Sequence, residues 1–235
     1  KCVMDENQWE HYQSSPLHIN LCNWADILIM APLTATTLSK WVNGNAEGLV
    51  SSILVANKKP IIVAPAMNTD MWNNEVVQNN YKKLNDFSNV LPLQPNEGLL
   101  ACDQFGMGKI PSNDLIILAL QYILSQENNL ILNDLAGKNF LVTGGSTSEK
   151  IDSARRITNN SSGTMGLLFA QVARFRGANV TYIHGPLKLD LKEGIKTIEI
   201  QTANDLSKVL KEEIDNCDYL VTNAAVTDIK FSKDI

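Results

Sequence analysis

A short apolar run at residues 61–64, Ile-Ile-Val-Ala, constrains the fold more than any other stretch of the chain. Its length and its β-branched residues favour a strand that is buried on both faces, as in a parallel sheet. Pro65 predicts the end of this strand, and Asn68 and Asp70 are short polar residues of the type that begins a helix. Asn68 therefore follows the carboxyl end of a predicted central strand, where open α/β sheets bind ligands. Taken alone, an Asn in this place is more often a helix cap than a binding residue.

Apolar runs and helical spacings alternate through the first half of the chain. Strands are expected at residues 27–30 and 90–93, and helices up to residue 42, at 47–56 and at 115–124. Residues 16–21 have the pattern of an extended segment, and the glycine-bearing stretch 98–108 has that of a loop. This alternation predicts a doubly wound parallel sheet with right-handed crossovers.

The composition becomes polar and Asn-rich near residue 125, which indicates a linker. A second α/β unit follows, with strands expected at residues 140–143, 179–183, 197–200 and 219–222 and helices at about 166–176 and 203–214. We therefore expect a first domain at residues 1–127, a linker at 128–138 and a second domain at 139–235.

Charge and cysteine usage exclude several classes of function. A net charge of −5 and a pI near 5.2 argue against a nucleic-acid binder, because affinity for a phosphate backbone depends on clustered Lys and Arg. The four cysteines form no CxxC pair and no zinc pattern, which favours a reducing compartment. Since no apolar run is of membrane-spanning length, we expect no membrane association and a cytoplasmic location.

Three stretches of the first half resemble a known family in their order and spacing. They contain His18, the sequence PAMNTDMW at residues 65–72, and Cys102 within the glycine-bearing stretch. They resemble the His, PxMNxxMW and substrate-flap Cys motifs of the flavin-dependent phosphopantothenoylcysteine decarboxylases. The flap departs from the family pattern ACGDxGxGR, because no Gly follows Cys102 and Lys109 replaces the Arg. The resemblance implies a flavodoxin-like sheet, FMN as cofactor, phosphopantothenoylcysteine as substrate, and trimeric units with FMN between subunits.

The resemblance assigns catalytic roles to three side chains. Decarboxylation of a cysteinyl group needs an electron sink, which a flavin supplies and no side chain can. His18 is implied to act as a base or to position the substrate, Asn68 to hold its carboxylate, and Cys102 to protonate the enethiolate product. Without the family, His18 and Cys102 would be interpreted as structural residues. Hydroxyl and backbone groups at the ends of predicted strands could contact the cofactor, although either Thr by itself could be a cap. These candidates are Thr34, Thr36, Ala66 and Met67.

The second half resembles the phosphopantothenate-cysteine ligases, over residues 141–166 (LVTGGSTSEKIDSARRITNNSSGTMG) and 224–228 (AAVTD). The order of all the motifs is that of the bifunctional bacterial proteins of coenzyme A biosynthesis. The resemblance implies a Rossmann-like α/β domain, dimeric in the family, that condenses 4′-phosphopantothenate with cysteine. The reaction uses CTP with Mg²⁺ and passes through an acyl-cytidylate; the sequence does not identify the magnesium ligands.

The ligase motifs also assign residues. Asn159 is implied to stabilise the acyl-cytidylate with Arg155 close to it, and Asp228 to contact the cytosine or ribose. Without the family, the double glycine would be a tight turn, Arg155 part of a solvated face and Asp228 a surface residue. The remaining nucleotide-binding candidates are Gly144, Gly145, Ser146, Ser161, Ser162, Gly163 and Ala225.

The family's FMN-phosphate loop and lysine-rich nucleotide segment have no counterpart between Lys1 and Ile235. We therefore expect a fragment that lacks both natural ends and is a poor ligase by itself.

Two alternatives come from other classes of protein. LVTGGST and TNAAV also suit a short-chain-dehydrogenase-like oxidoreductase, but that class needs a Tyr with Lys four residues later, and no Tyr of this chain has one. A non-enzymatic flavin-fold regulatory module is the second alternative, and Cys102 argues against it.

Overall fold

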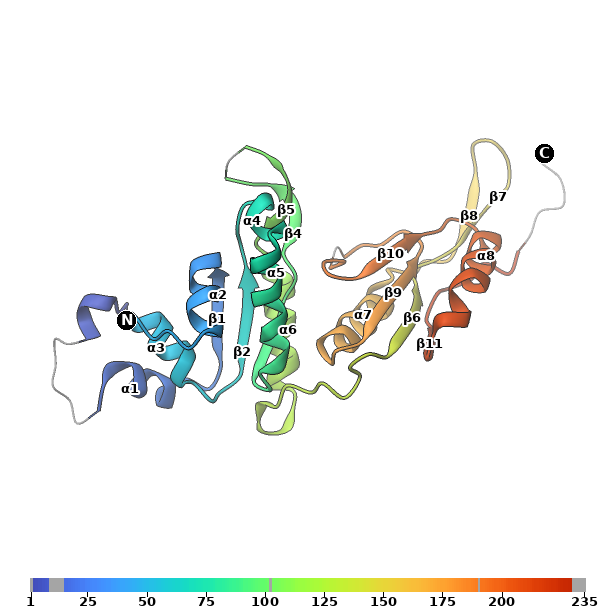
Figure 1. Ribbon diagram of the computed structural model, residues 1–235. Coiled ribbons are helices and arrows are strands. Elements are labelled where there is room, and N and C mark those ends of the chain that lie inside the picture. The colour runs from blue at the N-terminus through green and yellow to red at the C-terminus, as the bar shows by residue number, and fades with distance from the viewer. Residues whose placement is uncertain (1, 9–14, 102, 190, 230–235) are drawn as a thin grey trace. The chain divides into compact units, whose positions relative to one another are not determined.

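The computed structural model describes residues 2–8, 15–101, 103–189 and 191–229, which form two compact units, residues 1–131 and 132–235. The boundary between the units lies within the predicted linker. Each unit is an α/β structure built on a parallel sheet (Figure 1).

Unit 1 begins with a short 3₁₀ helix and contains three parallel strands and a β-hairpin. Its elements are η1 (Asp5–Gln8), α1 (Leu17–Trp24), β1 (Leu28–Leu33), α2 (Ala35–Val42), α3 (Leu49–Ala56), β2 (Ile61–Pro65), α4 (Thr69–Asn73), α5 (Glu75–Lys82), η2 (Lys83–Asp86), β3 (Val90–Pro92), β4 (Asn96–Leu99), β5 (Phe105–Lys109), α6 (Asn113–Leu124) and η3 (Glu127–Asn129).

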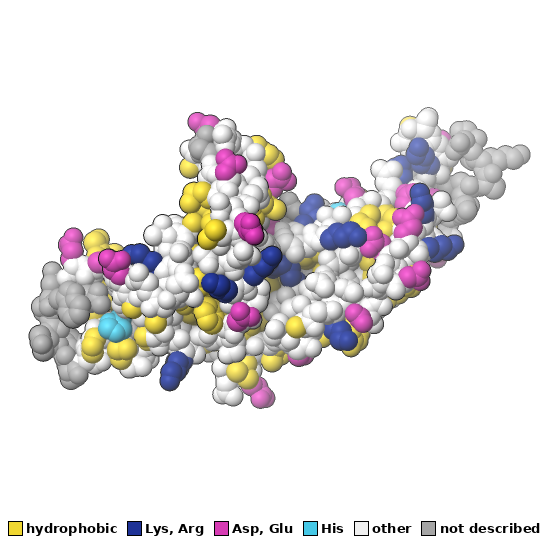
Figure 2. Space-filling view, in the orientation of Figure 1, with side chains coloured by type: hydrophobic (Ala, Val, Ile, Leu, Met, Phe, Trp, Pro, Cys, Tyr) yellow, Lys and Arg dark blue, Asp and Glu magenta, His cyan; other side chains and the backbone are white. Residues whose placement is uncertain are grey.

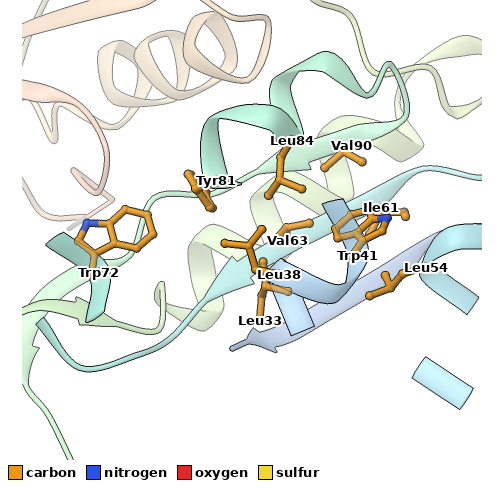
Figure 3. Close-up of a cluster of buried hydrophobic side chains, with 10 residues drawn as sticks. All are labelled: Leu33, Leu38, Trp41, Leu54, Ile61, Val63, Trp72, Tyr81, Leu84 and Val90. Atoms are coloured by element: carbon orange, nitrogen blue, oxygen red, sulfur yellow. The ribbon is translucent and has the colours of Figure 1, made fainter. Parts of the chain in front are cut away.

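The predicted central strand is β2, which pairs in parallel with β1 on one side and β3 on the other. All five of its residues are buried. Ile61 and Val63 point into one core cluster, with side chains from α2, α3 and α5 around them (Figure 3). Because side chains alternate along a strand, Ile62 lies on the opposite face, and α6 also contacts β2. The burial of β2 on both faces explains why its sequence is continuously apolar.

Two segments of unit 1 differ from the sequence prediction. Residues 17–21 of the segment expected to be extended belong to α1 instead. Cys22 of this helix is buried, and its Sγ lies 3.6 Å from the carbonyl oxygen of Ile53 in α3. Packing against α3 therefore determines the conformation of this segment, which the local sequence alone did not predict. The stretch 98–108, expected to be a loop, contains most of an antiparallel hairpin, β4–β5. The helix α5 was not predicted.

Unit 2 contains a four-stranded parallel sheet in the order β10-β9-β6-β11 and a two-stranded hairpin, β7–β8, which was not predicted. Its elements are β6 (Asn139–Gly144), β7 (Ser148–Lys150), β8 (Arg156–Thr158), α7 (Thr164–Phe175), β9 (Asn179–His184), β10 (Lys196–Glu199), α8 (Ala203–Glu213), η4 (Ile214–Asn216) and β11 (Tyr219–Thr222). All four strands of the parallel sheet were predicted to within about two residues at each end.

The two long helices of unit 2 lie on opposite faces of its sheet. Leu141 and Ile183 form a core cluster with Leu206 and other side chains of α8. The helix α7 contacts β6 and β9, and Tyr182, which alternates with Ile183, is bonded to the residue before α7. Among the described residues, no helix is both long and apolar enough to cross a bilayer.

Candidate functional site

The carboxyl ends of β1 and β2 meet at one edge of the unit 1 sheet. The amide of Ala66 donates to the carbonyl oxygen of Leu33, at 3.0 Å, so Thr34 and Ala66 lie beside each other. Thr34 caps α2 by accepting a hydrogen bond from the amide of Thr37, and Thr36 is exposed on the first turn of the same helix. Four of the predicted candidates, Thr34, Ala66, Met67 and Asn68, therefore lie along one edge, where a doubly wound sheet binds ligands.

Asn68 is the N-cap of α4. Its Oδ1 accepts hydrogen bonds from the amides of Asp70 at 2.8 Å and Met71 at 3.2 Å. Asn68 therefore has the helix-capping role that is expected of a lone Asn in this position. The two bonds also fix the side chain, whose Nδ2 carries its N–H donors.

The β4–β5 hairpin is joined to this segment through glycines on one of its faces. The amide of Met67 donates to the carbonyl oxygen of Gly108 at 2.9 Å. A Cβ on Gly108 would lie 2.2 Å from the carbonyl oxygen of Met67, and a Cβ on Gly106 would lie 2.4 Å from Thr69 Oγ1. These glycines were expected to be loop residues, but they allow the hairpin to lie directly against the residues around Asn68.

The opposite face of the hairpin is apolar and exposed. Leu99 and Phe105 are paired across the two strands, and Met107 follows Phe105 on the same face. Figure 2 shows apolar side chains gathered along this hairpin. Cys102, between the two strands, lies outside the described residues, so its predicted role stays a prediction.

His18 is the second residue of α1 and is not brought to Asn68 within the chain. The helix α1 lies against α3 and η1, whereas Asn68 precedes α4, which contacts α5 and β5 at another part of unit 1 (Figure 1). His18 is partly exposed, yet its Nδ1 atom is buried and has no hydrogen-bond partner in the part of the chain that the structure describes. One chain therefore does not assemble the predicted triad.

The predicted nucleotide residues of unit 2 do come together. Gly144 is the last residue of β6, Gly145 has a φ of 73°, and Ser146 forms an isolated parallel bridge with Ala225. The amide of Ala225 donates to the carbonyl oxygen of Gly145 at 2.8 Å. These bonds hold the Gly-Gly turn beside the segment that follows β11.

Asn159 joins the same group. Its Nδ2 donates to the carbonyl oxygens of Ala225 at 3.3 Å and Val226 at 3.0 Å. Thr158, which precedes it, donates through Oγ1 to the carbonyl oxygen of Thr147 at 2.8 Å. Thr147 and Thr158 were not predicted as site residues, although hydroxyl residues that adjoin a predicted site are a usable signal.

The residues Ser161–Gly163 precede α7 and close the other side of the turn. Gly163 is the N-cap of α7 with a φ of 71°, and a Cβ there would lie 3.1 Å from the amide nitrogen of Gly145. A helix start beside a glycine turn presents backbone N–H groups and the positive end of the helix dipole to an anion.

The predicted role of Arg155 close to the acyl-cytidylate stays a prediction. This residue lies between β7 and β8, four residues before Asn159, with its side chain 70% exposed and paired with Asp152 at 2.5 Å. This guanidinium, aided by the amides of Ala154 and Arg155, lowers the pKa of the Asp152 carboxyl below its usual value. Because β8 is extended, the Cα atoms of Arg155 and Asn159 are separated by up to roughly 13 Å.

Asp228 is exposed and follows Thr227, which is buried and bonded to Thr147 through both its amide and its hydroxyl. The backbone before Asp228 is thus anchored to the Gly-Gly turn. Among the described residues, no group of three or more His, Cys, Asp or Glu side chains could hold a metal ion.

Comparisons with known proteins match both units. Residues 1–124 match the family model described as flavoprotein, and residues 135–234 match the C-terminal domain of DNA/pantothenate metabolism flavoprotein. The coenzyme A biosynthesis bifunctional protein CoaBC of Bacillus subtilis (strain 168) is 34% identical over 212 residues, which cover 90% of this chain and 51% of that protein. The protein of the same name from Haemophilus influenzae is 37% identical over 227 residues, covering 92% and 55%. The chain spans about half the length of the curated relatives it matches.

A solved structure supports the fold of unit 1. A cysteine-to-serine mutant of PPC decarboxylase, complexed with pantothenoylaminoethenethiol, is 33% identical with a TM-score of 0.51, over 53% of this chain and 70% of that one. The prediction of a flavodoxin-like parallel sheet is thereby confirmed for the first half of the chain.

Proposed function

The chain belongs to the flavoprotein family, and we propose that unit 1 catalyses the FMN-dependent decarboxylation of phosphopantothenoylcysteine to 4′-phosphopantetheine in coenzyme A biosynthesis. The observation that carries this proposal is the position of Asn68. It follows the central strand, is fixed by α4, and lies beside a hairpin that is bonded to its neighbour Met67.

The residues present fit a flavin. Thr34, Ala66 and Met67 form a polar backbone edge at the ends of adjacent strands. Thr69 Oγ1 is buried beside Gly106 and has no hydrogen-bond partner among the residues described, which suits a site completed by a ligand. When bound, FMN supplies the electron sink that cysteinyl decarboxylation needs.

The chain's own residues would bind the substrate and move its protons. The Asn68 amide donates to the cysteinyl carboxylate without adding a formal charge that would over-stabilise the ground state. The carboxylate leaves as CO₂, and the Cys102 thiol returns one proton to the product carbon. Before that step, His18 orients the thiol of the substrate and accepts the proton of that substrate thiol.

A homo-oligomer would bring His18 to this site. Since α1 and α4 lie apart in one chain, His18 of one copy has to lie near Asn68 of another. The buried Nδ1 without a partner in the described residues supports an assembled state in which that atom is bonded. We therefore propose a homo-oligomer, for which the family resemblance implies trimeric decarboxylase units and dimers of unit 2.

The test is a decarboxylation assay on the chain supplied with FMN, together with its absorbance spectrum. A bound yellow flavin and release of CO₂ from phosphopantothenoylcysteine are expected. Asn68→Ala should abolish CO₂ release, whereas Asn85→Ala, an exposed change elsewhere in unit 1, should not alter it. A wild-type chain that binds flavin but leaves the substrate intact would overturn the proposal.

Unit 2 is proposed to be a Rossmann-like domain that binds CTP with Mg²⁺ and contributes to the ligation of 4′-phosphopantothenate and cysteine. Support comes from the match to residues 135–234 and from the grouping of Gly145, Asn159, Gly163 and Ala225 at the carboxyl end of β6. Calorimetric titration with CTP in the presence of Mg²⁺ tests this, with ATP as the control nucleotide. Equal affinity for CTP and ATP, or no binding of either nucleotide, would contradict the proposal. No observation favours the oxidoreductase or regulatory-module alternatives.

A further inference from the structure

Tyr182 on β9 was not a predicted site residue. It lies next to Gly144, Gly163 and Gly166 of unit 2. Its side chain is fully buried, and its hydroxyl donates to the carbonyl oxygen of Gly163 at 3.0 Å. Burial raises the pKa of Tyr182 to about 12, so the hydroxyl keeps its proton at neutral pH and remains a donor.

Two glycines make room for this ring. A Cβ on Gly144 would lie 2.2 Å from the Tyr182 hydroxyl oxygen, and a Cβ on Gly166 would lie 3.2 Å from its Cε2. Gly144 ends β6, and Gly166 is in the first turn of α7. The ring therefore lies between the strand that leads into the Gly-Gly turn and the helix that faces it.

We propose that Tyr182 is a positioning residue for the phosphate-binding part of the site. It sets the spacing between the Gly144–Ser146 turn and the Ser161–Gly163 segment, so that both segments line one anion site. The inference rests on the proposed nucleotide function of unit 2. It adds to that function a requirement for the Tyr182 hydroxyl, which acts through Gly163 and does not touch the ligand.

The arrangement predicts loosening rather than unfolding when the hydroxyl is lost. The Gly163 carbonyl oxygen also accepts the first helical bond of α7, from the amide of Leu167 at 3.1 Å. Tyr182→Phe would therefore leave that oxygen with a partner and the ring volume unchanged, while removing the link to β9.

The main experiment compares Tyr182→Phe with the matched control Tyr219→Phe, whose side chain lies on β11 and is 48% exposed. Affinity for Mg²⁺·CTP should fall about fivefold in Tyr182→Phe, the size expected for one hydrogen bond, and stay unchanged in Tyr219→Phe. Affinity for cytidine, which has no phosphates, should stay unchanged in both. Equal loss for CTP and cytidine would indicate general destabilisation and overturn the proposal, as would unchanged affinity for CTP.

Hydrogen exchange in the ligand-free chain distinguishes failure of the proposed nucleotide function from failure of the proposed Tyr182 role. If the wild-type chain does not bind CTP, the nucleotide proposal fails, and the Leu167 amide still reports on the Tyr182 link. Faster exchange at Leu167 in Tyr182→Phe, with the middle of α7 unchanged, would support the link. Exchange equal to that of the wild type would overturn it.

A second pair of variants tests the proposal even if one single variant misfolds. Gly144→Ala introduces the Cβ that would collide with the Tyr182 hydroxyl. Adding Tyr182→Leu to this variant removes the colliding atoms and should restore the fold measured by thermal melting, but not the affinity for CTP. If the double variant recovers both, the hydroxyl has no positioning role.

Discussion

Asn68 has a visible role in holding α4 and a proposed role in holding a carboxylate, and two substitutions separate them. Asn68→Ala removes the cap and should lower the free energy of unfolding by about 1 kcal/mol. Asn68→Asp keeps an oxygen for the amides of Asp70 and Met71, so stability should remain near that of the wild type. Its negative charge would repel the substrate carboxylate, so decarboxylation should be lost in both variants.

Urea unfolding and CO₂ release measure the two effects independently. If Asn68→Asp retained decarboxylation, Asn68 would be a cap only. Loss of stability in Asn68→Asp would instead show that its side chain needs more than an acceptor oxygen.

The motif residues of unit 2 that lie together in the structure are those held by bonds to the backbone. Asn159 lies beside Ala225 because its Nδ2 donates to the carbonyl oxygen of Ala225. Arg155 lies at the other end of β8, where it pairs with Asp152. Hairpin β7–β8 could not be predicted from its six strand residues, which contain one strongly apolar side chain, Ile157.

Among the elements, the β4–β5 hairpin depends on glycines at which a side chain has no room. Gly108→Ala would add a Cβ 2.2 Å from the carbonyl oxygen of Met67 at a φ of 132°. We expect a loss of about 3 kcal/mol or more in the free energy of unfolding, since it combines backbone strain with a collision. Gly44→Ala is the matched control, because its φ of 70° is also strained but nothing lies within 4 Å of its Cβ.

The control should cost only about 1 kcal/mol. Urea unfolding gives both values, and exchange of the Met67 amide reports on the hairpin contact itself. Equal costs for the two variants would mean that the contact with Met67 contributes nothing. The same glycines explain why this hairpin was predicted as a loop: glycine signals a turn in sequence patterns, but here it permits close approach.

The start of α8 gives a prediction about pH. Asp205 accepts a hydrogen bond from the amide of Thr202 in a capping box, and this bond lowers the pKa of Asp205. The folded pKa is thus below the unfolded value of about 3.9. The stability that Asp205 contributes is complete above that unfolded value and is lost as pH falls through the folded one.

Asp205→Asn keeps an acceptor oxygen but cannot titrate in this range. The difference in free energy of unfolding between wild type and variant should be constant from about pH 7 to 5 and should shrink below about pH 4. Urea unfolding at a series of pH values measures it. A difference that stays constant down to about pH 3 would show that the capping box does not favour the carboxylate.

For the whole molecule, the sequence predicted two α/β units because buried parallel strands are continuous apolar runs, and β2 and β6 both have this pattern. It could not predict that α1 and α4 lie apart, since the distance between two helices depends on packing and not on motif order. His18 and Asn68 are therefore joined only in the proposed assembly of several copies.

Mixing two inactive variants tests that assembly. His18→Ala and Asn68→Ala chains, co-expressed in equal amounts, should form some sites with a native His18 from one copy and a native Asn68 from the next. Random assembly gives one half times one half, or about a quarter, of the wild-type decarboxylation per site. The double variant His18→Ala/Asn68→Ala, co-expressed with wild type, should also leave about a quarter of the sites native if each site spans two copies, but about half if each lies within one. No recovery in the first mixture, together with half activity in the second, would place both side chains in the same copy and contradict the shared site.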